Sequence, residues 1–119
     1  MVYKIKKLDD ISSINNLGDE AHHALVHYVN ILSSEYNYND VVDSNLGGCI
    51  LYISSGTASE DILAYFDYKN NNAEFIAIDA NVCIAVFITG DDYGIVMIMD
   101  IEVTPQEILN KATPKSIFT

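Results

Sequence analysis

The sequence contains no arginine and no tryptophan, and it has only six basic residues, all of them lysines. Arginine is the side chain that clamps phosphate and carboxylate groups with two parallel hydrogen bonds. Its absence counts against many enzymes that act on phosphate or carboxylate substrates. The chemistry of recognition must therefore depend on other residue types.

Long hydrophobic runs and cysteines are also scarce. The longest apolar runs are the seven residues from Val82 and the five from Ile95, and a membrane-spanning helix needs about 20. No basic segment precedes an apolar one at the N-terminus, so no secretory signal is expected. Cys49 and Cys83 are the only cysteines. These features predict a soluble cytoplasmic protein with two reduced thiols and no membrane contact.

Acidic residues, in contrast, are abundant and unevenly placed. The chain has a formal net charge of −11, with seventeen acidic residues. All seventeen lie between residues 9 and 110, where Lys69 is the only basic residue, so this segment carries a charge of −16. Such a segment repels phosphate backbones and anionic lipids and attracts a basic partner. A plain role in keeping the protein soluble is the competing explanation.

The chain is organised around two apolar segments, 82–88 and 95–99. Both are rich in β-branched residues, and they flank the pentapeptide Gly90-Asp91-Asp92-Tyr93-Gly94, so the pattern predicts a β-hairpin. Neither segment alternates with polar residues. Both strands are therefore expected in the middle of a sheet, covered on each face by another layer or by another subunit.

The remaining elements follow from periodicity and turn residues. Apolar residues at helical spacing predict a helix from Asp19 to about Ser34, and Thr104-Pro105-Gln106-Glu107 predicts the start of a short C-terminal helix capped by Thr104. Further predicted elements are an edge strand at 2–8, a loop at 9–18 with one helical turn at 11–14, a loop at 35–48, a strand at 49–54, a helical turn from 57, a strand at 63–68 and a strand at 74–78. Residues 79–81 are predicted to form a tight turn, with one long bent strand as the alternative.

These elements predict a single α+β domain over residues 1–119. The expected core is an antiparallel sheet of about five strands, with one amphipathic helix packed on a face and a short C-terminal helix. Because the central strands are uninterrupted apolar runs, a homodimer that covers the second face of the sheet is left open.

One set of residues in the chain is spaced as the ligands of a metal ion would be. His23 and His27 are four residues apart on the predicted helix, and Asp19 lies one turn before them on the same side. This face is otherwise polar, as an ordinary solvated surface is, and zinc sites need further ligands and supporting groups. His22 lies nearer the apolar side and is predicted to be a packing residue. The carboxylates of Asp100 and Glu102 are expected on one side of a strand, suited to acid-base or divalent-metal chemistry.

Cys49 is the only candidate nucleophile, because Cys83 lies inside an apolar run. A cysteine nucleophile needs a histidine close to it in space. The simpler interpretation is a small apolar side chain at the start of a strand. A small metal-dependent or cysteine enzyme therefore remains an alternative hypothesis, and a dimeric structural or ligand-binding module is another. No metal or cofactor is expected.

Tyrosines surrounded by acidic residues point to protein recognition. Tyrosine is enriched at protein interfaces, and acidic groups can occupy the place of phosphates on a basic surface. The leading hypothesis is a small acidic inhibitor that blocks a basic nucleic-acid-processing protein such as a nuclease. Phage anti-defence proteins such as anti-CRISPRs, and bacterial immunity proteins, have this size and character, although no family motif is present. The predicted partner-binding residues are Tyr36, Tyr38, Asp40, Asp43, Asp91, Asp92 and Tyr93.

Overall fold

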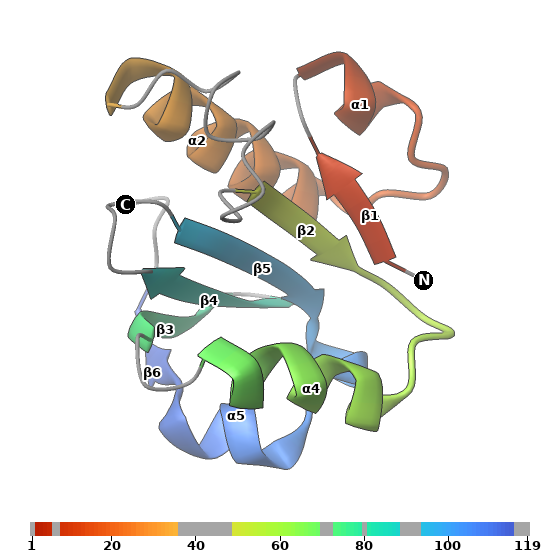
Figure 1. Ribbon diagram of the computed structural model, residues 1–119. Coiled ribbons are helices and arrows are strands. Elements are labelled where there is room, and N and C mark those ends of the chain that lie inside the picture. Colours follow the sequence, from red (N-terminus) through yellow and green to blue (C-terminus); the bar gives the residue numbers. More distant parts are fainter. Residues whose placement is uncertain are drawn as a thin grey trace.

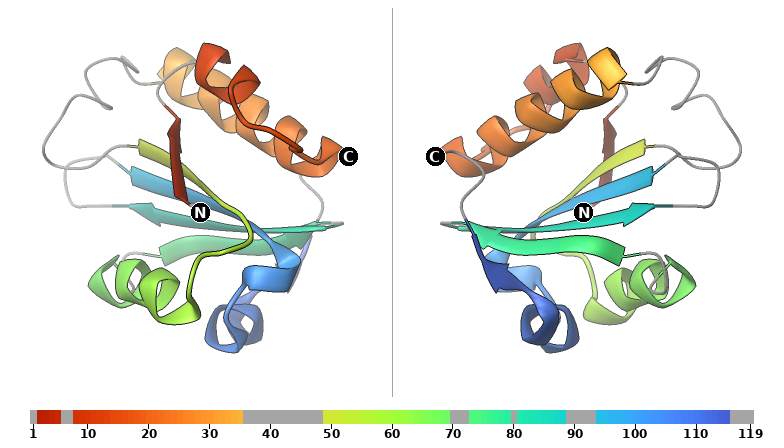
Figure 2. Two further views of the ribbon diagram at one scale, coloured as in Figure 1. Left: turned by 90° about the vertical axis from the view of Figure 1, so that its right-hand side faces the viewer. Right: turned by 90° about the vertical axis from the view of Figure 1, so that its left-hand side faces the viewer.

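The protein folds into a mixed β-sheet with helices on both faces (Figures 1 and 2). The computed structural model describes residues 2–5, 8–35, 49–69, 73–79, 81–88 and 94–115. Within these residues the strands are β1 (Val2–Ile5), β2 (Cys49–Ile53), β3 (Ala73–Asp79), β4 (Val82–Ile88), β5 (Gly94–Asp100) and β6 (Thr113–Pro114). The helices are α1 (Leu8–Ser12), α2 (Asp19–Glu35), α4 (Ser59–Lys69), the 3-10 turn η2 (Ile101–Val103) and α5 (Gln106–Lys111).

The sheet has six strands in the order β1-β2-β5-β4-β3-β6. Strand β2 pairs with β5 in parallel, and β3 pairs with β6 in parallel, whereas the other neighbours are antiparallel. The predicted antiparallel sheet of five strands is therefore partly wrong. Parallel neighbours need a long connection between them, and here the chain passes through α4 and the β3–β4 hairpin between β2 and β5.

The predicted central hairpin is confirmed. Strands β4 and β5 are antiparallel neighbours in the middle of the sheet, with Ile84 opposite Ile98. Asp79 of β3 faces Val82 of β4, so a two-residue connection joins these strands, as the predicted tight turn requires. The edge strand predicted at the N-terminus is also present as β1, which pairs only with β2.

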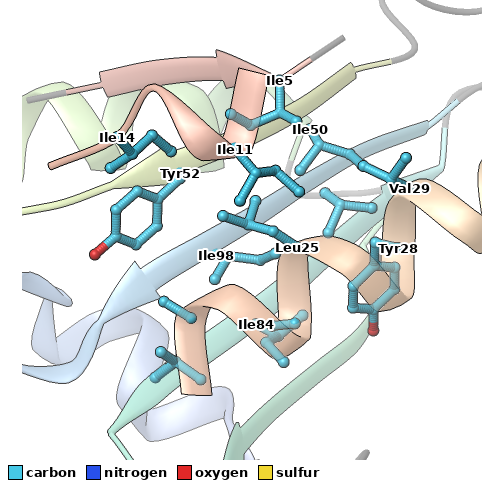
Figure 3. Packing of buried hydrophobic residues seen from close by; sticks show 14 residues of the cluster. Ile5, Ile11, Ile14, Leu25, Tyr28, Val29, Ile50, Tyr52, Ile84 and Ile98 are labelled. Carbon is cyan, nitrogen blue, oxygen red and sulfur yellow. The ribbon is translucent and has the colours of Figure 1, made fainter. Parts of the chain in front are cut away.

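Helices α1 and α2 cover one face of the sheet (Figure 2). The apolar stripe of α2 is confirmed, because Ala21, Leu25 and Val29 are buried in one cluster with strand residues. Figure 3 shows Leu25 among the side chains of this cluster, which include Ile84 and Ile98. The alternate residues of the same strands point to the other face, so both faces need cover. This explains why the central strands are uninterrupted apolar runs.

Helices α4 and α5 cover the opposite face (Figure 2). Ile62 of α4 and Ile108 of α5 are fully buried beside Met97 and Met99 of β5. The strand predicted at 63–68 is therefore wrong, since these residues belong to α4. The chain supplies its own second layer, so a homodimer is not needed to cover this face.

The structure also corrects two smaller predictions. The helical turn expected at 11–14 lies earlier, as α1. Thr104 does not cap α5. Its hydroxyl donates a hydrogen bond of 2.9 Å to the carbonyl of Asp100, and Pro105 occupies the position before the helix. The Thr104 hydroxyl thus stabilises the chain reversal after β5, and α5 begins where the Pro105 carbonyl accepts bonds from Ile108 and Leu109.

Among the described helices, none has the length and apolar character needed to cross a lipid bilayer.

Candidate functional site

The end of the sheet where β2, β3 and β5 finish is rich in carboxylates. Asp79 is opposite Val82, and Val82 is opposite Asp100, so the last residues of β3 and β5 lie on either side of the first residue of β4. Glu102 follows in η2. In Figure 1 the tips of β2 and β5 and the start of α4 lie on the right of the sheet. Two carboxylates from strand ends and one from η2 therefore share one end of the molecule.

Three helices also begin at this end, each with acidic residues in its first turn. The start of α2 is joined to the sheet by a hydrogen bond of 3.3 Å from the Asn81 side-chain amide to Glu20. Carboxylates stabilise the positive end of a helix dipole. We call this set of residues the acidic end: Asp19, Glu20, Glu60, Asp61, Asp79, Asp100, Glu102 and Glu107. Apart from Asp9 and Asp10 of α1, it includes every acidic side chain that the structure describes.

Lysine is sparse at the acidic end. Lys115 lies beside it, because its backbone amide donates a hydrogen bond of 3.2 Å to the carbonyl of Ile78, next to Asp79. Lys4 is paired with Leu51 within the sheet, and Lys111 ends α5. Positive charge at this end is thus greatly outnumbered, and the field there is negative.

A cleft of about 330 Å³ opens at the acidic end. It is lined by Asn81, Asp100, Ile101 and Glu102. The amide of Ile101 donates a hydrogen bond of 3.0 Å to the carbonyl of Asn81, which fixes η2 against the start of β4. Ionised carboxylates only accept hydrogen bonds, so this lining suits lysine or arginine side chains rather than phosphate.

Asp100 is held in place by a tyrosine from another strand. The Tyr52 hydroxyl in β2 lies 2.8 Å and 2.9 Å from the two carboxylate oxygens of Asp100 and donates a hydrogen bond to that carboxylate. Burial raises the pKa of Tyr52, and the hydrogen bond and negative charge of Asp100 raise it further. The phenol therefore stays protonated at neutral pH, where it acts as a donor and not as a base. The ring of Tyr3 stacks on that of Tyr52, with 6.0 Å between ring centroids.

The other titrating groups of the core are also held in their neutral forms. Burial raises the pKa of the Cys83 thiol to about 11 and that of the Tyr28 phenol to about 12. Nucleophilic cysteine chemistry needs the thiolate, which Cys83 does not supply near neutral pH. Its assignment as an inert cysteine agrees with its complete burial.

The chain matches no protein family model, no curated protein and no solved structure. Its function must be inferred from the geometry and charge of its own residues.

The predicted partner-binding residues Tyr36, Tyr38, Asp40, Asp43, Asp91, Asp92 and Tyr93 lie outside the described residues. The strands that follow their two segments are neighbours, because Cys49 at the start of β2 is opposite Ile95 of β5. This is the end of the sheet opposite the acidic end. The seven residues remain a prediction from the sequence.

The structure does not bring the three residues of the alternative metal face together as a ligand cluster. Asp19, His23 and His27 are exposed on α2. Nowhere among the described residues do three histidine, cysteine or acidic side chains lie close enough to share a metal ion. His22 is exposed too, so its assignment as a packing residue is wrong. Cys49 begins β2, but its side chain is outside the described part of the structure.

Some features of the acidic end could not be predicted from the sequence. The pairing of Asp100 with Glu102 on one strand is wrong, because β5 ends at Asp100 and Glu102 lies in the 3-10 turn. The contact between Tyr52 and Asp100 had no signal in the sequence, because 48 residues separate them. The position of Glu20 beside Asn81 likewise depends on the packing of α2 on the sheet.

Proposed function

We propose that this protein is an acidic inhibitor that binds and blocks a basic protein that processes nucleic acid. The observation that supports the proposal is the gathering of carboxylates at the acidic end, in a chain with no arginine. A surface of this kind attracts cationic surfaces over several ångströms and speeds their association. Basic proteins that bind nucleic acid present such cationic surfaces, because they neutralise phosphates with lysine and arginine.

The same arrangement opposes binding of nucleic acid by the chain itself. Helix N-termini commonly bind phosphate, because their free amides and dipole favour negative charge. Here the first turns of α2, α4 and α5 already carry carboxylates. A phosphate at any of these helix starts would be repelled. The acidic end thus offers carboxylates in the role of phosphates, which supports a role as competitor of a nucleic acid.

The competing explanation is that the carboxylates at each helix start serve only to stabilise that helix. Carboxylates in the first turn stabilise a helix by about 0.3 to 1 kcal/mol each. The topology then brings the helix starts together, because α4 and α5 come after β2 and β5, and the start of α2 packs beside Asn81. The two explanations differ in what they predict for binding, and variants with equal net charge distinguish them.

The first experiment is an affinity pull-down from the source cell, carried out at about 50 mM and about 500 mM salt, followed by an inhibition assay on the retained protein. A basic nucleic-acid enzyme is expected to be retained at low salt. In the Glu60→Gln/Glu102→Gln variant the Kd for that partner should rise about tenfold. Each exposed charge pair contributes up to about 1 kcal/mol, and the variant removes two such charges.

The matched control is Asp9→Asn/Asp10→Asn, which removes the same charge from α1, away from the acidic end. Its Kd is expected to change less than twofold. An equal loss in both variants would mean that only the net charge matters. Retention of no basic protein at either salt concentration would contradict the proposed function.

A further inference from the structure

We draw no further inference here: the strongest candidate, the cleft lined by Asn81, Asp100, Ile101 and Glu102, belongs to the acidic end already described, and no second observation among the described residues points to a ligand that it would take.

Discussion

At the scale of single residues, the contact between Tyr52 and Asp100 determines the geometry of the acidic end. Both oxygens of Asp100 lie within hydrogen-bonding distance of one hydroxyl, and the Asp100 carbonyl accepts a further bond from Thr104. The carboxylate is thereby fixed in the lining of the cleft while the backbone turns into η2. A hydrogen bond to a charged group contributes about 1.5 to 3 kcal/mol, more than one between neutral groups.

Removal of the Tyr52 hydroxyl should therefore destabilise the protein. We expect Tyr52→Phe to lower the free energy of unfolding by about 2 kcal/mol, because the half-buried carboxylate of Asp100 loses its partner. Urea denaturation followed by circular dichroism measures this. Tyr3→Phe is the control, because it makes the same chemical change on the ring that stacks on Tyr52. An equal loss of unfolding free energy in both variants would show that the hydrogen bond to Asp100 does not account for the loss.

At the scale of elements, α4 shows where sequence patterns mislead. Its segment 63–68 contains two tyrosines and a phenylalanine, and aromatic residues favour strands. β-propensity, however, depends strongly on where a segment packs. The helical turn predicted from residue 57 correctly indicated a helix start, and α4 continues from Ser59 to Lys69 with Ile62 buried against the sheet. Tertiary packing outweighed local preference here.

The helical state of this segment can be tested directly. Ala64 is an exposed residue inside α4, so Ala64→Gly should lower the free energy of unfolding by about 1 kcal/mol. The control is Ala58→Gly, just before α4, where the carbonyl already accepts bonds from Asp61 and Ile62 and glycine is well tolerated. We expect a change within a few tenths of a kcal/mol for the control. A negligible effect at both positions, measured by urea denaturation, would argue against a helix at 63–68.

At the scale of the whole molecule, two separate apolar clusters stabilise the fold from opposite faces of one sheet. One contains Leu25, Ile84 and Ile98, and the other contains Ile62 and Ile108. The chain buries both faces with its own helices. The stability of the monomer should therefore not depend on a partner subunit.

Ile108→Ala tests this arrangement. The residue is fully buried, and truncation should lower the free energy of unfolding by about 2 to 5 kcal/mol. The denaturation midpoint should not depend on protein concentration in either the wild-type chain or the variant. The exposed residue Gln106 in the same helix provides the control variant Gln106→Ala, with an expected change below about 0.5 kcal/mol. A midpoint that rises with protein concentration would instead show that association contributes to stability.

The sequence alone determined the features that depend on near neighbours in the chain. The helical stripe of α2, the central hairpin and the edge strand β1 follow from periodicity and turn residues, which act over a few residues. The excess of acidic residues over basic ones is likewise a property of composition. None of these predictions required knowledge of long-range contacts.

Only the tertiary structure decided which distant residues meet. The parallel pairing of β2 with β5 brings Tyr52 to Asp100, and the order of the strands gathers the starts of α2, α4 and α5 at one end of the sheet. The physical reason is that helices on both faces must bury the apolar residues of the central strands, and this requirement determines the path of the chain. The acidic end is a consequence of that path, which no local pattern of residues specifies.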